Sequence, residues 1–234
     1  IVEGIKIILE APVGRLIQLY VAEGYFAQQE HRADLEKICN YHKIKYEIVT
    51  DKVFQEITDT QTPQGILAVV RQFHYQLEDL FLKEQPAHLI ILEGLQDPGN
   101  LGTILRAGEG AGITGIIMSK GTVDIYNAKV IRSTMGSIYR VPFFYTDCLK
   151  DVIEKIQKRC TIYAAHLQGE CCYEKEDYTK DTAFLIGNEA NGLSKEVASY
   201  ANRLVKIPML GEVESLNAAI AASILMYEVS RQRR

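Results

Sequence analysis

Hydrophobic residues in the first 72 positions recur with two periods, which together predict a small unit of helices and strands. Apolar residues at helical spacing share one face of a predicted first helix: Val2, Ile5, Ile8 and Leu9. Residues 28–41 repeat this spacing and indicate a second amphipathic helix. Short apolar runs predict strands over residues 16–21, 46–49 and 65–70.

The pattern changes after residue 72 and then alternates regularly. Residues 73–86 are richer in charge and end in Pro86, so we place a boundary there. Six apolar runs follow and predict strands near 88–93, 114–118, 138–141, 161–166, 182–187 and 203–207. Strands that alternate with helices are typical of a mostly parallel sheet covered on both faces. The predicted organisation is a small α/β domain (1–75), a linker (76–86) and a larger α/β domain (87–234).

A polar loop follows the first strand of the larger domain. Asp97-Pro98-Gly99 is a turn that a central strand does not tolerate, and apolar residues at helical spacing begin directly after it. This pattern places Asn100 near the start of a helix and Arg106 about two turns into it.

A second polar loop follows the predicted strand 182–187. Gly187 and Gly192 bound this loop and allow a ligand to approach the backbone closely, while Glu189 offers a carboxylate. An equally simple interpretation is a strand-to-helix turn with Ser194 as the helix N-cap.

A third loop follows Pro208, which ends the last predicted strand. Ser215, as a plausible N-cap, and Asn217 open a long alanine-rich helix whose small residues permit close packing, for example against a second subunit. Ligands of open α/β sheets bind at the carboxyl ends of the strands. We therefore expect the polar side chains of the three loops to converge: Asn100, Arg106, Glu189, Ser215 and Asn217.

Composition and charge restrict the classes of function. With 47% hydrophobic and 24% charged residues, the chain is typical of globular domains. A net charge of −4 argues against a surface that is basic throughout, but a local basic patch for nucleic acid remains open. Candidates by position, each of which also fits a plain solvated residue, are Arg71, Lys120, Arg132 and Arg140.

The absence of targeting signals and the cysteine pattern both indicate a cytoplasmic protein. No apolar stretch approaches the ~20 residues of a membrane helix, and no signal peptide is visible, so we expect a cytoplasmic protein. Because Ile1 lies within a predicted helix and no initiator Met precedes it, we expect the natural chain to begin earlier. Five cysteines without a CxxC pair indicate neither a disulfide framework nor a zinc site.

Two further stretches have both functional and plain interpretations. Residues 110–115 fit GxGxxG, but they follow a predicted helix and precede a strand, whereas a dinucleotide site needs the reverse order. We interpret them as a helix-ending turn, which argues against a nucleotide-dependent oxidoreductase. The polar residues 60–65 form a loop that either approaches nucleic acid or simply connects two elements.

The three polar loops together resemble the signature motifs of a known family. DPGNLGTILR (97–106), IGNEANGLS (186–194) and IPMLGEVESLNAAIAAS (207–223) look like those of the SpoU (TrmH) family of RNA ribose 2′-O-methyltransferases, in the SPOUT superfamily. The resemblance covers the chain from His88 onward. Val2-Glu3-Gly4 on the predicted first helix, and residues 62–68, are similar to the ribosomal-protein-like RNA-binding domain of many members.

The resemblance implies a fold, a cofactor and an assembly. Such enzymes thread their C-terminal segment into a trefoil knot, which holds S-adenosylmethionine, and they form homodimers with the active site near the subunit interface. By motif position the cofactor residues are Gly187, Asn188, Ile207, Met209 and Leu216. The polar active-site positions are Asn100, Arg106, Glu189, Ser215 and Asn217. We expect RNA contacts from Thr62, Gln64, Arg71 and Arg132.

The implied reaction is an in-line transfer of a methyl group from a sulfonium to a ribose hydroxyl, which needs no metal. A guanidinium stays protonated, so we assign Arg106 to the adjoining phosphate and to stabilising alkoxide character rather than to proton removal. The extra N-terminal domain favours ribosomal over transfer RNA as substrate. The alternatives are a transfer-RNA 2′-O-methyltransferase and a catalytically silent RNA-binding or ribosome-assembly factor.

Overall fold

The computed structural model describes residues 1–81, 84–169 and 171–234, and the chain divides into two compact units, Ile1–Phe73 and His74–Arg234. The predicted linker 76–86 includes residues 82 and 83, which lie outside the described residues. Its first part forms a short 3-10 helix, η1 (Leu77–Leu80), and Leu80 is fully buried in the core of the second unit. This part of the linker therefore belongs structurally to the second unit.

The first unit is a four-stranded sheet with four helices. The strands lie in the order β1 (Val2–Glu3), β4 (Ile66–Val70), β2 (Leu16–Ala22) and β3 (Tyr46–Val49). β4 runs antiparallel to both of its neighbours, whereas β2 and β3 are parallel. The helices are α1 (Ile5–Glu10), α2 (Glu23–Ala27), α3 (Gln29–His42) and α4 (Asp51–Ile57).

The start of the chain differs from the predicted helix. Val2 and Glu3 form a strand, and the helix begins only at Ile5. Gly4 lies between them at φ +103°, a backbone conformation that other residues avoid, and its N–H donates to the carbonyl of Ile66. The prediction that Ile1 and Val2-Glu3-Gly4 lie on the first helix was therefore wrong, because helical spacing alone does not reveal a glycine break.

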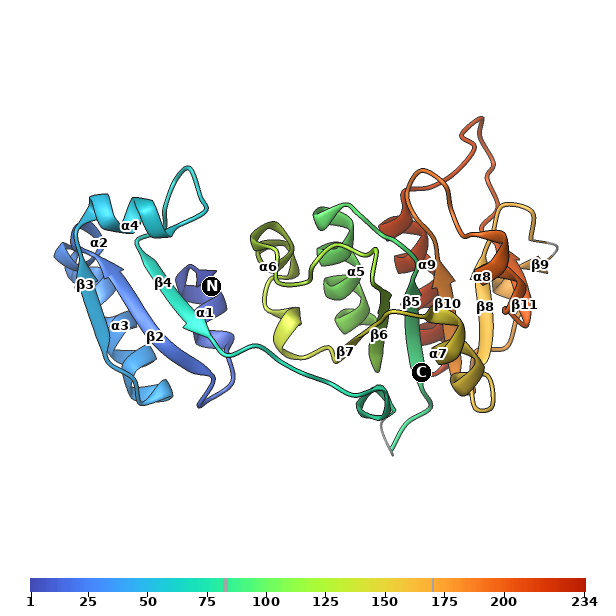
Figure 1. Ribbon diagram of the computed structural model, residues 1–234, viewed down its shortest axis with the longest axis horizontal. Helices are drawn as coiled ribbons and strands as arrows, with labels where there is room; N and C mark the ends of the chain where they lie inside the picture. The colour runs from blue at the N-terminus through green and yellow to red at the C-terminus, as the bar shows by residue number, and fades with distance from the viewer. Residues whose placement is uncertain (82–83, 170) are drawn as a thin grey trace. The chain divides into compact units, whose positions relative to one another are not determined.

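The second unit contains a seven-stranded parallel sheet (Figure 1). Its order is β7 (Phe143–Thr146), β6 (Gly115–Ser119), β5 (His88–Leu92), β10 (Thr182–Ile186), β8 (Thr161–Ala165), β11 (Arg203–Lys206) and β9 (Cys171–Cys172). The central strands β5 and β10 are buried along their whole length, as their continuous apolar runs predicted.

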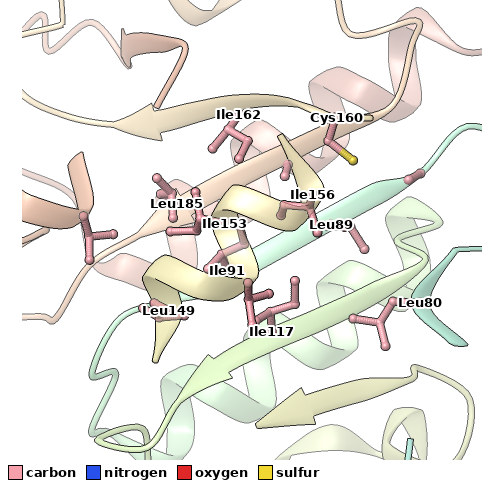
Figure 2. Packing of buried hydrophobic residues seen from close by; sticks show 14 of the residues in the cluster. Leu80, Leu89, Ile91, Ile117, Leu149, Ile153, Ile156, Cys160, Ile162 and Leu185 are labelled. Atoms are coloured by element: carbon pink, nitrogen blue, oxygen red, sulfur yellow. The ribbon is translucent and has the colours of Figure 1, made fainter. Parts of the chain in front are cut away.

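Helices cover both faces of this sheet. α5 (Pro98–Ala111) and α9 (Ala218–Gln232) pack against each other on one face, with α6 (Ala128–Thr134) beside α5. α7 (Leu149–Ile156) lies on the other face, where Leu89, Ile91 and Ile153 belong to one buried cluster (Figure 2). Each such fully buried side chain contributes about 1.5–3 kcal/mol of hydrophobic stabilisation. The remaining helical elements are α8 (Lys195–Ser199), η2 (Ser137–Tyr139) and η3 (Tyr173–Lys175).

One predicted strand of this unit was wrong. Residues 137–139 form the 3-10 helix η2, and the strand lies further along, over Phe143–Thr146. Gly136 at φ +89° starts a tight turn in which Tyr139 N–H donates to the Gly136 carbonyl over 3.0 Å. A short apolar run without a clear period did not distinguish this turn from a strand.

The strand order defines where a ligand can bind. From β5 the chain proceeds outward to β6 and β7, whereas β10 lies on the opposite side of β5. Such a reversal of strand order leaves a crevice at the carboxyl ends of the two central strands. Glu93–Asp97 leaves β5 and leads into the first sequence motif, and Gly187–Leu193 leaves β10 and carries most of the second.

Candidate functional site

The loop that leaves β10 is a tight turn that requires glycine at both ends. Asn188 and Gly192 exchange two backbone hydrogen bonds of 3.0 and 2.8 Å. A Cβ atom at Gly187 would lie only 2.1 Å from the carbonyl carbon of Gly192. Gly192 itself has φ +66°. The two glycines thus let the chain fold back on itself directly at the end of a buried strand.

The Asn188 side chain fixes this loop internally and to β5. Its Oδ1 accepts from the backbone N–H groups of Ala190 and Asn191, at 2.9 and 3.2 Å. Its Nδ2 donates to the carbonyl of Gly94 over 2.8 Å. The side chain is therefore occupied by protein contacts and supports the wall of the site.

Glu189 joins the loop after β10 to the start of α5. Its carboxylate accepts from the backbone N–H of Gln96 and Asp97 at 3.1 and 2.9 Å, and from Nδ2 of Asn100 at 3.0 Å. Partial burial by itself would raise the pKa of Glu189. The hydrogen bonds from Asn100 and the two backbone donors outweigh burial, so the pKa lies below its ordinary value. Glu189 is consequently an ionised acceptor at neutral pH.

Asn100 connects the first motif to the third. Nδ2 of Asn217 donates to Oδ1 of Asn100 over 2.9 Å, while Nδ2 of Asn100 donates to Glu189. Asn217 is also the N-cap of α9, because its Oδ1 accepts from the N–H groups of Ala219 and Ile220. The prediction that Ser215 caps this helix was therefore wrong. Both asparagine amides are oriented by partners on two sides.

A cavity of about 510 Å³ lies beside this network. Of the predicted site residues, the lining includes Gly187, Asn188, Glu189, Ile207, Met209, Ser215 and Leu216. It also includes residues that sequence reasoning missed, among them Ala165 at the end of β8 and His166, Leu167 and Gln168 directly after it. Their position after a parallel strand adjoining β10 was the available signal, but this segment has no polar motif of its own.

A second connection between the loops was also missed. Glu93, directly after β5, accepts from the backbone N–H of Ser194 at 2.8 Å and from its hydroxyl at 2.7 Å. Ser194 in turn accepts from the N–H of Val197 and is the N-cap of α8, as predicted. Two carboxylates, Glu93 and Glu189, therefore hold the ends of β5 and β10 together.

Arg106 is not part of this network. Its side chain is exposed two turns into α5 and does not line the cavity. Among the described residues it makes no ion pair and no hydrogen bond through its guanidinium. The structure thus brings together four of the five predicted polar positions: Asn100, Glu189 and Asn217 form the network, and Ser215 lies on the cavity wall. The guanidinium of Arg106 is left available to a molecule outside the chain.

The residues expected to contact RNA are distributed over both units. Thr62, Gln64 and Arg71 are exposed in the first unit, and Arg132 is exposed on α6 in the second. The other two basic candidates have partners. Lys120 pairs with Asp147 over 3.2 Å, and Arg140 pairs with Glu109.

The part of the chain that the structure describes was searched for metal-binding groups and for membrane-spanning helices. It holds no group of three or more His, Cys, Asp or Glu side chains arranged for a metal ion. Its helices include none with the length and hydrophobicity of a membrane span.

Comparison with known families decides what kind of site this is. Residues 87–227 match the model of the SpoU rRNA Methylase family, and residues 1–76 match the model for RNA 2′-O ribose methyltransferase substrate binding. The chain belongs to the SpoU family of RNA methyltransferases. The family resemblance read from the three motifs is confirmed.

Known SpoU proteins are similar over most of their length. The 23S rRNA (guanosine(2553)-2′-O)-methyltransferase RlmP of Bacillus subtilis is 31% identical over 182 residues, which cover 78% of this chain and 71% of that protein. A putative TrmH family tRNA/rRNA methyltransferase of Staphylococcus saprophyticus is 31% identical over 206 residues. The aligned residues cover 86% of this chain and 82% of that protein.

Solved structures confirm the fold class. The SpoU methyltransferase AviRb from Streptomyces viridochromogenes, in complex with AdoMet, superposes with a TM-score of 0.86 at 26% identity, covering 99% of this chain and 89% of that one. An AdoMet-bound rRNA methyltransferase from Sinorhizobium meliloti gives a TM-score of 0.82 at 30% identity, covering 98% and 85%.

Proposed function

We propose that this protein transfers a methyl group from S-adenosylmethionine to a ribose 2′-hydroxyl of ribosomal RNA. The observation that carries the proposal is the chain of hydrogen bonds from Asn217 through Asn100 to Glu189, at the wall of the 510 Å³ cavity. It joins the three family motifs into one site. The AdoMet-bound structures of AviRb and of the Sinorhizobium rRNA methyltransferase named above support the choice of methyl donor.

The cavity fits S-adenosylmethionine in size and chemistry. Its volume lies within the roughly 300–1,000 Å³ typical of small-molecule sites. Ile207, Met209 and Leu216 supply apolar surface for an adenosine group, and Gly187 lies on the same cavity wall. The Glu189 carboxylate on the wall favours a cationic ligand. When bound, S-adenosylmethionine supplies a methyl group already activated by its sulfonium.

Glu189 and Asn100 act as positioning residues in this proposal. Its three shortest side-chain hydrogen bonds, of 2.9–3.1 Å, come from the turn before α5 and from Asn100, and a longer one of 3.5 Å comes from Asn188, so its carboxylate is committed to holding that turn. Its lowered pKa also makes it a weak base. We therefore do not assign proton removal to Glu189. Its role is to keep the wall of the methyl-donor cavity in register with the loop that faces RNA.

Arg106 is the residue that we assign to the substrate. An exposed guanidinium without a partner among the described residues is suited to bind the phosphate beside the target ribose through two parallel hydrogen bonds. The same charge stabilises alkoxide character as the 2′-hydroxyl loses its proton to phosphate or water.

We also propose that the enzyme is a homodimer. Ile220 and Tyr227 on α9 leave 49% and 46% of their surface exposed, and α9 packs against α5, which carries Arg106. A second copy on this face would cover apolar surface and bring Arg106 to the partner's cavity.

Two measurements test this arrangement. A mixture of Arg106→Ala and Gly187→Ala chains should regain transfer, because each mixed dimer keeps one intact cavity and one intact Arg106. Light scattering should give twice the mass of one chain. A monomeric mass would contradict the dimer.

The substrate is ribosomal RNA in preference to transfer RNA. Support comes from the N-terminal substrate-binding unit and from the name of the Bacillus relative. Such a substrate would place the activity in the cytoplasm. The trefoil knot expected from the resemblance stays a prediction.

Calorimetry and a transfer assay test this proposal together. We expect S-adenosylmethionine to bind the purified chain, and labelled methyl to enter a 23S ribosomal RNA transcript rather than transfer RNA. Methylation of transfer RNA alone would favour the transfer-RNA alternative. No binding of S-adenosylmethionine would favour the silent RNA-binding factor, against which the retention of all five polar positions argues.

A further inference from the structure

The N-terminal unit has a cavity of its own, of about 330 Å³. We call it the Tyr25 pocket, after one of its aromatic residues. Residues from the end of β2, from α2, α3 and α4, from the junction of α2 and α3 and from the loop before β4 line it: Ala22, Gly24, Tyr25, Gln28, His31, Asp51, Phe54, Gln55, Pro63, Gln64 and Gly65. The methyltransfer reaction proposed above uses none of these groups directly.

Two stacked rings belong to this pocket. The rings of Tyr25 and His31 have centroids 3.8 Å apart and planes only 12° from parallel. Nδ1 of His31 lies 3.1 Å from the carbonyl oxygen of Tyr25. Because a carbonyl only accepts, we assign a proton to Nδ1, while the other ring nitrogen, Nε2, lies 3.9 Å from a carboxylate oxygen of Glu30. The stack therefore offers a flat surface with a polar edge.

A carboxylate and three amides provide polar groups in the pocket. Oδ1 of Asp51 accepts from the backbone N–H of Gly24 over 3.0 Å. The second oxygen of Asp51 has no hydrogen-bond partner among the described residues. The side-chain amides of Gln28, Gln55 and Gln64 can both donate and accept.

Glu3 holds the loop that forms one side of the pocket. Its carboxylate accepts from the hydroxyls of Thr58 and Thr60 and from the backbone N–H of Gln64. Gly65 follows at φ +78°, where a Cβ atom would lie 2.7 Å from Cβ of Tyr25. The loop is thus fixed against the aromatic side by internal contacts, so this side of the pocket does not depend on a ligand for its shape.

We infer that the Tyr25 pocket binds one unpaired RNA base that carries an exocyclic amino group. The inference rests on the proposed RNA substrate, and it is supported by the match of residues 1–76 to a substrate-binding model. Unpaired bases are recognised by stacking on aromatic side chains and by hydrogen bonds to their edges. The second Asp51 oxygen is exposed and can accept from an amino group of such a base. Uracil presents its single N–H between two carbonyls that a carboxylate repels.

The first test compares the direction in which two substitutions, each removing one negative charge, change the KM for RNA. Asp51→Asn keeps the acceptor for Gly24 but removes the negative charge, and we expect it to raise the KM for 23S ribosomal RNA about tenfold with kcat unchanged. Glu36→Gln is the matched control, because Glu36 is exposed on α3 and does not line the pocket. Losing a charge there leaves KM the same or lowers it, since RNA is an anion. Equal behaviour of the two variants would overturn the inference while leaving methyl transfer intact.

The second test does not depend on methyl transfer. Saturation-transfer NMR on the full chain with CMP, GMP, AMP and UMP should show saturation of the base protons, weakest for UMP. This signal should be lost in His31→Ala and kept in Glu36→Gln. A signal that is equal for all four nucleotides, absent from wild type or unaffected by His31→Ala would contradict the inference, even if the chain transferred no methyl group at all.

Discussion

The amide of Asn217 donates to the amide oxygen of Asn100 over 2.9 Å, although 117 positions separate the two residues in the chain. Asn217 caps α9 and Asn100 lies in the first turn of α5, so this contact ties the starts of two helices together. The Asn100 amide in turn reaches Glu189. The orientation of one small amide thus depends on three motifs at once.

Removing this amide should impair transfer and spare cofactor binding. Asn100→Ala disconnects Asn217 from Glu189, but Asn100 does not line the cavity. We expect kcat/KM for RNA to fall about 100-fold, since small displacements of positioned groups have effects of this size. Calorimetry should give an unchanged Kd for S-adenosylmethionine. Asn40→Ala, on an exposed residue of the first unit, is the control, and a variant as active as wild type would refute the positioning role.

Arg106→Lys separates charge from geometry. Lysine keeps the positive charge but loses the planar fork that binds a phosphate through two hydrogen bonds. We expect single-turnover transfer with saturating RNA to slow by about 10²-fold or more. Because Arg106 is exposed, the free energy of unfolding should change by less than about 0.5 kcal/mol. Transfer at the wild-type rate would show that Arg106 does not have the proposed role.

Sequence patterns predicted the parts of the fold that follow from local chemistry. The Asp97-Pro98-Gly99 turn correctly placed the start of α5, where Asp97 caps the helix. The buried strands β5 and β10 followed from their apolar runs. By contrast, Val2 and Glu3 were assigned to a helix because the φ of Gly4 is set by pairing with β4, more than 60 residues away in the chain.

Gly187→Ala tests the close approach within the second motif. The added Cβ would meet backbone atoms of Gly192 and Leu193, which cannot rotate away as a side chain can. We expect the free energy of unfolding in urea to fall by about 1–3 kcal/mol, the usual range for overpacking. The affinity for S-adenosylmethionine should fall at least about tenfold, since every tenfold loss requires only ~1.4 kcal/mol.

The control for this substitution is Gly121→Ala. The nearest atom to a Cβ at Gly121 is Cα of Gly94 at 3.8 Å, an ordinary contact. Equal stability and equal affinity of the Gly187 and Gly121 variants would show that the loop after β10 adapts to a side chain.

His88 should make the second unit sensitive to acid. Burial at the start of the central strand β5, with a smaller effect of the Arg233 guanidinium, lowers the pKa of His88 from 6.5 to about 3. Below pH 6.5 the unfolded chain takes up a proton that the folded chain does not. The free energy of unfolding should therefore fall with pH between 6.5 and about 3, by at most about 1.4 kcal/mol per pH unit from this group.

The substitution His88→Leu isolates this contribution. Denaturation in urea at several pH values should give a shallower loss of stability below pH 6.5 than in wild type. His74→Leu, on an exposed histidine, should leave the slope unchanged. An identical acid dependence of His88→Leu and wild type would rule out the assigned pKa.

The candidate site was predictable to the extent that it lies in motifs. Glu189, Asn100 and Asn217 were expected to converge, and they form one network. The contact between Glu93 and Ser194 was not predicted, because it depends on the neighbouring positions of β5 and β10 in the sheet. The cap of α9 was misplaced because Ser215 and Asn217 are both good N-cap residues and only the backbone decides between them.

The most direct test of the central claim is nucleoside mass spectrometry of RNA after reaction. Purified protein is incubated with S-adenosylmethionine carrying a deuterated methyl group and with unmodified 23S ribosomal RNA, which is then digested to nucleosides. The account predicts one ribose-methylated nucleoside that carries the label, and much less of it from the Arg106→Lys and Asn100→Ala variants after a short incubation of equal length. Label on a base, or no label in any RNA while S-adenosylmethionine is bound, would contradict the assignment of this site to ribose 2′-O-methylation.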